Sequence, residues 1–108
     1  MLKHIVMWKF IDGAQGRSAT EHALWMKSHL EALVGQIPEI KSLEVGVNIS
    51  SSPMAYDAVQ TLVVEDAEAL RRYREHPAHQ EISQHCHEVR SARIVVDWRQ
   101  CLSACLKQ

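Results

Sequence analysis

The 108 residues of the chain suit one domain and are too few for two, so we expect a single domain over residues 1–108, with its core at about 2–98 and a tail at 99–108. The hydrophobic fraction of 46% and the charged fraction of 23% are ordinary for globular proteins and argue against a disordered, collagen-like or coiled-coil chain. With 12 Lys and Arg residues against 13 Asp and Glu residues the formal net charge is -1, which leaves no excess positive charge for binding nucleic acid.

The sequence shows no targeting or membrane segment. No apolar run approaches the roughly 20 residues that span a bilayer, and the alternating, charged N-terminus lacks the apolar core of a signal peptide. The cysteines Cys86, Cys101 and Cys105 form no C-x-x-C pair, which suits a reducing compartment better than a disulfide framework. We therefore expect a cytoplasmic protein without a membrane partner.

The first expected element is a strand over residues 2–10. Its residues alternate in character, so one face carries Leu2, His4, Val6, Trp8 and Phe10. His4 is the polar member of this otherwise apolar row, which makes it a candidate site residue. The other face has a lysine at each end and apolar residues between them, so we expect it to be partly buried.

A helix is expected to follow, from the capping box of Ser18 and Glu21 to near Gly35. Apolar residues recur in it at steps of three and four as far as Ile37, after which Pro38 disfavours continuation. Trp25 lies beside this apolar stripe.

Alternation predicts two more strands, over residues 41–49, with Ile49 facing inward, and over residues 57–65. Both faces of the later strand carry apolar side chains. Because the chain has too few helices to cover both faces of a sheet, we expect the second face to contact another subunit.

Two helices and a last strand complete the pattern. Asp66 can cap a helix that runs to about Glu75, and Pro77 suits the first position of a helix that ends around Arg90. Residues 91–98 alternate as a fourth strand. The order β-α-β-β-α-β predicts a ferredoxin-like α+β sandwich with its helices on one face of the sheet.

The three tryptophans are candidates for the walls of a pocket. Trp8 and Trp98 fall at positions that we expect to face inward on the first and last strands, and Trp25 can approach from the first helix. We therefore expect all three to line a substrate pocket.

The segment from Tyr73 to His79 contains a tyrosine hydroxyl and the two imidazoles of His76 and His79, interrupted by Pro77. An imidazole gives or takes a proton near neutral pH, and a tyrosine can donate a hydrogen bond to a developing enolate. Such a group suits proton abstraction next to a carbonyl. The structural alternative is a helix junction, in which His76 caps backbone groups, Tyr73 is a half-buried anchor and His79 is solvated.

We expect no metal site. His76 with His79, and His85 with His87 around Cys86, are the pairs that could be considered as ligands. Residues two apart on a helix point in different directions, and neither an H-x-x-x-H motif nor a cysteine pair defines a tetrahedral set.

Three segments of the chain resemble the stress-responsive α/β-barrel domain family, also called Dabb. They are the opening Lys3–Phe10, the corner Tyr73-x-x-His76-Pro77-x-His79 and the closing Val95–Trp98. The likeness covers about residues 2–98 and is most specific at the corner. It implies a ferredoxin-like chain that pairs through its sheet into a dimeric α+β barrel, and hence a homodimer.

The chain is also similar to the plant polyketide cyclases of this family, which close a linear polyketide thioester by aldol condensation without a cofactor. This resemblance implies that His79 is the catalytic base and that Tyr73 holds the developing oxyanion or the substrate carbonyl. It implies substrate-binding roles for His4 and His76, which match further histidines of those enzymes. One more pocket histidine of the plant cyclases falls at Ala58 here.

Three functions follow from these observations. The first is a cofactor-free enzyme acting on a small carbonyl-rich or aromatic molecule, as a polyketide cyclase or related aldol-type lyase. The second is a non-catalytic, stress-responsive dimer that binds a small molecule. The third is cofactor-independent oxygenation of a quinol-type ring, as in the related antibiotic-biosynthesis monooxygenase barrels. The sequence does not identify the substrate.

Overall fold

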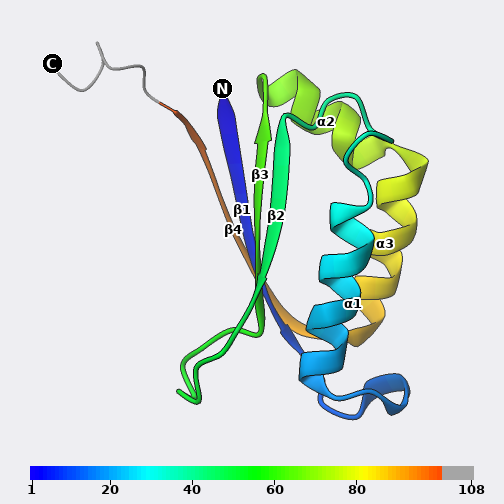
Figure 1. Cartoon of the computed structure of the whole chain (residues 1–108), viewed down its shortest axis with the longest axis vertical. Coiled ribbons are helices and arrows are strands. Elements are labelled where there is room, and N and C mark those ends of the chain that lie inside the picture. The colour runs from blue at the N-terminus through cyan, green and yellow to red at the C-terminus, as the bar shows by residue number, and fades with distance from the viewer. Residues whose placement is uncertain (101–108) are drawn as a thin grey trace, which may run out of the picture.

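The computed structural model describes residues 1–100 as a four-stranded antiparallel sheet with α-helices packed on one face (Figure 1). The elements in chain order are β1 (Leu2–Phe10), the short 3-10 helix η1 (Ala14–Gly16), α1 (Ala19–Glu31), β2 (Ser42–Val47), β3 (Ala58–Val64), α2 (Ala67–Glu75), α3 (Pro77–Val89) and β4 (Arg90–Arg99). This architecture confirms the predicted ferredoxin-like α+β fold. Cys101 and Cys105 lie outside the described residues, as does the predicted tail from residue 101 onward. Within residues 1–100, no helix has the length and apolar character needed to cross a membrane.

The sheet has the strand order β2-β3-β1-β4, so β1 lies inside the sheet and β4 forms one edge. His4 is paired with Leu62 of β3 on one side and with Asp97 of β4 on the other. Because directly paired residues share a face, this register brings polar groups of β1 and β4 together on the side of the helices.

The core lies between the sheet and the helices. On β1, the residues from His4 to Phe10 that face the helices are buried in alternation, as the pattern predicts. The opposite face of the sheet has no helix among the described residues (Figure 1). Exposed apolar side chains lie there on β4, with Val96 62% and Trp98 45% exposed.

Two boundaries differ from the sequence-based expectation. The helix α1 ends at Glu31, and the chain continues in tight turns in which Gly35 adopts a positive φ of 91°. Leu33 and Ile37 are buried although they follow the helix. The apolar pattern therefore continues past Glu31, which is why the sequence predicted a longer helix. The prediction that Ile49 faces inward is wrong, because β2 ends at Val47 and Ile49 is fully exposed in the loop that follows.

The predicted orientation of the last strand is also wrong. Asp97 is paired with His4 and Arg93 with Trp8, so the odd-numbered residues of β4 face the helices. Trp98 therefore lies on the opposite face, where the Lys3 ammonium is 5.9 Å from the centre of its ring. Alternation alone could not show this, because both faces of β4 carry apolar residues.

Candidate functional site

The corner between α2 and α3 is shaped by Pro77. His76 has extended backbone angles (φ -63°, ψ 132°), as a residue before proline prefers, and Pro77 is the first residue of α3. The His76 Nδ1 atom accepts a hydrogen bond of 3.1 Å from the Ala78 backbone N–H. His76 is thus the N-cap of α3, the role that the structural alternative assigns to it, and it does not line the cavity described next.

A cavity of about 50 Å³ lies between the sheet and the helices. Its lining residues are His4, Val6, Trp8, Met26, Leu30, Gln60, His79, Ile82, Ser83, Cys86, Arg90 and Arg93. This volume holds only a few water molecules. The cavity adjoins an open groove of about 550 Å³, and His79, Ser83, Arg90 and Arg93 line both. A larger ligand therefore has room in the groove, with only a small part of it reaching the cavity.

His4 is held in the cavity wall by Asp97. The His4 Nδ1 atom lies 2.5 Å from the Asp97 Oδ1 atom, and the imidazole is almost fully buried. A carboxylate fixes which ring nitrogen carries the proton, so Nδ1–H donates to Asp97 and Nε2 keeps its lone pair. Burial lowers the pKa of His4 below its ordinary value of 6.5, against the opposing effect of Asp97. His4 is therefore a neutral imidazole near pH 7.

His79 is held in a similar way by a backbone carbonyl. Its Nδ1 atom lies 3.2 Å from the Arg74 carbonyl oxygen, which can only accept a hydrogen bond, so Nδ1 carries the proton. Burial is the main cause of a lowered pKa at His79 as well. The Nε2 atom is therefore unprotonated near neutral pH, as a general base requires.

Tyr73 lies behind the cavity and does not line it. Its side chain is fully buried, its ring centre is 4.5 Å from that of His79, and its hydroxyl donates a 3.3 Å hydrogen bond to Gln60 Oε1. Burial raises the pKa of Tyr73, so the phenol stays protonated and can serve as a donor. Gln60 does line the cavity, which connects the Tyr73 hydroxyl to the site.

The model of the stress-responsive A/B barrel domain family, Dabb, matches residues 2–100. The chain belongs to the Dabb family. An uncharacterized protein of Streptomyces coelicolor is 42% identical to this Dabb chain over 80 residues, which are 74% of this chain and 80% of that protein.

Solved structures similar to this Dabb chain include a dimeric ferredoxin-like protein and a hydroxynitrile lyase. A dimeric ferredoxin-like protein of unknown function from Thermobifida fusca has a TM-score of 0.77 at 19% identity, covering 92% of this chain and 90% of that one. The hydroxynitrile lyase of Passiflora edulis has a TM-score of 0.74 at 10% identity, covering 94% of this chain and 95% of that one. At these identities the likeness shows the fold alone.

One of the three tryptophans lines the cavity of this Dabb chain. Trp8 does so from β1, as predicted from its position. Trp25 instead packs between two imidazoles away from the cavity, with its ring centre 3.7 Å from that of His29 and 4.0 Å from that of His85. Trp98 faces the opposite side of the sheet. Neither Trp25 nor Trp98 lines this cavity, and their roles in substrate binding stay predictions.

Several residues of the site were missed by the sequence analysis. Gln60 is the one polar residue among the inward-facing, otherwise apolar residues of β3. The same pattern made His4 a candidate on β1, so Gln60 could have been predicted from the sequence in the same way. Asp97 was missed because its strand was assigned the opposite orientation. Cys86 also lines the cavity, but burial raises the pKa of its thiol to about 11, so it stays protonated. Among residues 1–100, no three metal-ligating side chains come together.

His4, which is buried, and His79, which is half-buried, make the stability of the fold depend on pH. The pKa values of His4 and His79 lie below the ordinary 6.5, so the unfolded chain binds more protons than the folded chain below that pH. We expect a lower free energy of unfolding at about pH 5.5 than at about pH 7.5, measured by urea denaturation. The difference should shrink in a His79→Gln variant. An equal or higher stability at the lower pH would contradict the neutral state of these imidazoles.

Proposed function

We propose that this protein is a cofactor-free enzyme that removes a proton next to a carbonyl group, as an aldol-type cyclase or lyase of the polyketide cyclase kind. His79 is the base and Tyr73 is the hydrogen-bond donor. The observation that carries the proposal is the state of His79, which lines the cavity and whose Nδ1–H is bonded to the Arg74 carbonyl, so that Nε2 keeps its lone pair. A buried, neutral phenol lies against the same imidazole.

The steps of such a reaction can be assigned to these groups. His79 Nε2 takes a proton from the carbon between two carbonyls, and the enolate carbon then attacks a further carbonyl elsewhere in the same molecule to form a C–C bond. The resulting alkoxide takes the proton back from the His79 imidazolium. Tyr73 stabilises the enolate oxygen once its hydroxyl exchanges Gln60 for the substrate.

His4 serves the same reaction as a positioning group. Its tautomer is fixed by Asp97, so its Nε2 atom can accept a hydrogen bond from an enol or hydroxyl of the substrate. The resemblance to the plant cyclases supports these roles, and the Passiflora edulis enzyme is a lyase in the same fold.

A panel of linear tri- and tetraketides, each as thioester and as free acid, tests the proposal, with cyclised products detected by liquid chromatography and mass spectrometry. Wild type is compared with the double variant His79→Ala/Tyr73→Phe and with His29→Ala, a matched histidine variant outside the cavity. We expect cyclisation with wild type and His29→Ala only. Product formation that is equal in the double variant would contradict the proposal.

The second candidate is a non-catalytic, small-molecule-binding protein. It is favoured by the small volume of the cavity and by the position of Tyr73 behind Gln60. It predicts that the double variant loses stability while no compound of the panel is converted faster by the wild type than by buffer.

We also propose that the protein is a homodimer joined through the sheet face that carries Val96 and Trp98. This face is apolar and has no helix over it among the described residues, and the similar Thermobifida fusca protein is dimeric. We expect light scattering to give the mass of a dimer at micromolar concentration and that of a monomer for Val96→Asp, which would bury an unpaired charge.

The matched control for the dimer is Leu24→Asp. Leu24 is exposed to a similar degree, at 52%, but lies on α1 on the other side of the molecule. A monomeric wild type, or a Leu24→Asp variant that dissociates equally, would contradict the proposed interface.

A further inference from the structure

The open groove beside the cavity is strongly basic. Its lining residues are Arg74, His79, Gln80, Ser83, Gln84, His87, Arg90 and Arg93, and none of them is an aspartate or a glutamate. They come from α2, α3 and the start of β4, three elements that meet at the edge of the sheet. Since the whole chain has a net charge of -1, this accumulation of guanidinium groups is local.

The arginines of the groove have few anionic partners within the described part of the chain. Arg74 is paired with Asp97, whose Oδ2 atom lies 3.6 Å away. Arg90 is bonded to His87 Nδ1, which is not a carboxylate. Arg93 makes no hydrogen bond or ion pair with its side chain among residues 1–100. Arg93 is exposed, and partial desolvation together with the charges of Arg90 and Arg74 lowers its pKa against the opposing effect of Asp97.

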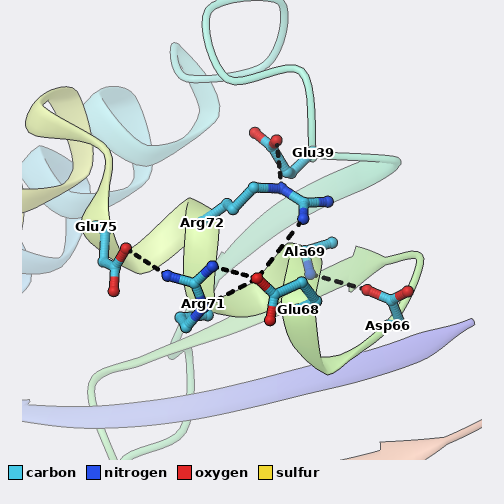
Figure 2. Close-up of polar contacts among 7 residues, drawn as sticks. All are labelled: Glu39, Asp66, Glu68, Ala69, Arg71, Arg72 and Glu75. Carbon is cyan, nitrogen blue, oxygen red and sulfur yellow. Dashed lines mark hydrogen bonds and ion pairs between the residues drawn. The ribbon is translucent and has the colours of Figure 1, made fainter.

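Two arginines of α2 outside the groove, Arg71 and Arg72, are paired with carboxylates. Figure 2 shows Arg71 of α2 between Glu68 and Glu75, and Arg72 bonded to Glu39 and paired with Glu68. Each of these exposed guanidinium groups faces carboxylates of the chain itself. Arg90 and Arg93 of the groove differ from them, since neither is paired with a carboxylate among residues 1–100.

We infer that the groove binds a carboxylate of the substrate, so that the substrate class is an oxo acid whose acid group lies at Arg90 and Arg93. A guanidinium binds a carboxylate through two parallel hydrogen bonds, and a second guanidinium adds further donors and a further favourable charge. This inference rests on the proposed function and names the kind of molecule on which His79 acts.

The position of the groove agrees with that chemistry. Arg93 and His79 line both the groove and the cavity, and Arg93 is directly paired with Trp8 of the cavity wall. A carboxylate held at Arg93 thus places the neighbouring carbonyl of the same molecule at the cavity, beside the His79 imidazole. The volume of about 550 Å³ is in the range of small-molecule sites, so the rest of the substrate fits in the groove.

Binding of matched small molecules tests the inference without any turnover. Acetoacetate and its methyl ester differ in one negative charge, and each is titrated into wild-type protein at constant ionic strength, followed by protein NMR shifts. We expect acetoacetate to bind about tenfold more tightly than the ester. This preference should disappear in Arg93→Gln and in Arg90→Gln, and should persist in Arg71→Gln, the paired arginine outside the groove.

The outcomes separate this inference from the proposed function. Equal binding of acid and ester, or an unchanged preference in both groove variants with intact circular dichroism spectra, would overturn the inference even if polyketides are cyclised. Inorganic phosphate that binds more tightly than acetoacetate would overturn the assignment to a carboxylate. Tighter binding of acetoacetate than of its methyl ester, by wild type and by His79→Ala/Tyr73→Phe, supports the carboxylate site. If the cyclisation assay then fails, that result counts against the proposed reaction and not against the carboxylate site.

Discussion

Replacement of His79 by alanine is expected to lower kcat/KM for the cyclised polyketide by about 100- to 10,000-fold, the usual contribution of a positioned general base. The reason is that His79 lines the cavity and that its Nδ1–H is held by the Arg74 carbonyl, which leaves Nε2 unprotonated. Steady-state kinetics of His79→Ala and of His29→Ala measure the effect. A His79→Ala rate within about twofold of the wild type would remove the base from the proposal.

The pH profile gives an independent readout of the same group. Because burial lowers the pKa of His79 below 6.5, the base stays unprotonated in mildly acidic solution. The acidic limb of the kcat/KM profile should therefore fall at a lower pH than that of a solvent-exposed histidine. A limb at or above pH 6.5 would contradict the observed environment of the imidazole.

The second large effect is expected for Tyr73→Phe, which removes the hydroxyl and keeps the ring. Loss of a donor to a developing oxyanion lowers kcat by roughly 100- to 1,000-fold. Gln60 Oε1 also loses its buried partner, which should lower the free energy of unfolding by about 1–3 kcal/mol. Kinetics and urea denaturation are measured on the same preparation.

Tyr56→Phe is the matched control for this substitution. Tyr56 is the second of the two tyrosines in the chain, and it lies at the loop before β3, away from the cavity. We expect this variant to retain both activity and stability. A Tyr73→Phe variant that loses stability but keeps its rate would show that the hydroxyl only supports Gln60.

The order of elements was predictable because the signals are local. Alternation along β1, the capping box at Ser18 and the proline at the start of α3 each depend on a few neighbouring residues, and the structure shows all three. The face of β4 was not predictable in this way. Its two faces are both partly apolar, and only its pairing with β1 decides that Asp97 and not Trp98 faces the helices.

Residues of the site were predictable only where a single polar residue interrupts the apolar face of a strand. His4 fulfils that condition on β1, and Gln60 fulfils it on β3. The sequence offers no reason to distinguish His76 from His79. In the structure His76 caps α3 and His79 lines the cavity, because Pro77 turns the chain between them. The groove could not be predicted, since Arg74 and Arg93 come together only through the packing of α2, α3 and β4.

The two faces of β1 contribute to different parts of the molecule. The side chains of His4 and Trp8 line the cavity, whereas Ile5 and Met7 alternate with them on the uncovered face of the sheet. A slip of one residue in this strand would exchange the two sets. Assembly against a second subunit would therefore depend on the same alignment as the site, because only the correctly registered strand places Ile5 and Met7 on the uncovered face while His4 and Trp8 line the cavity.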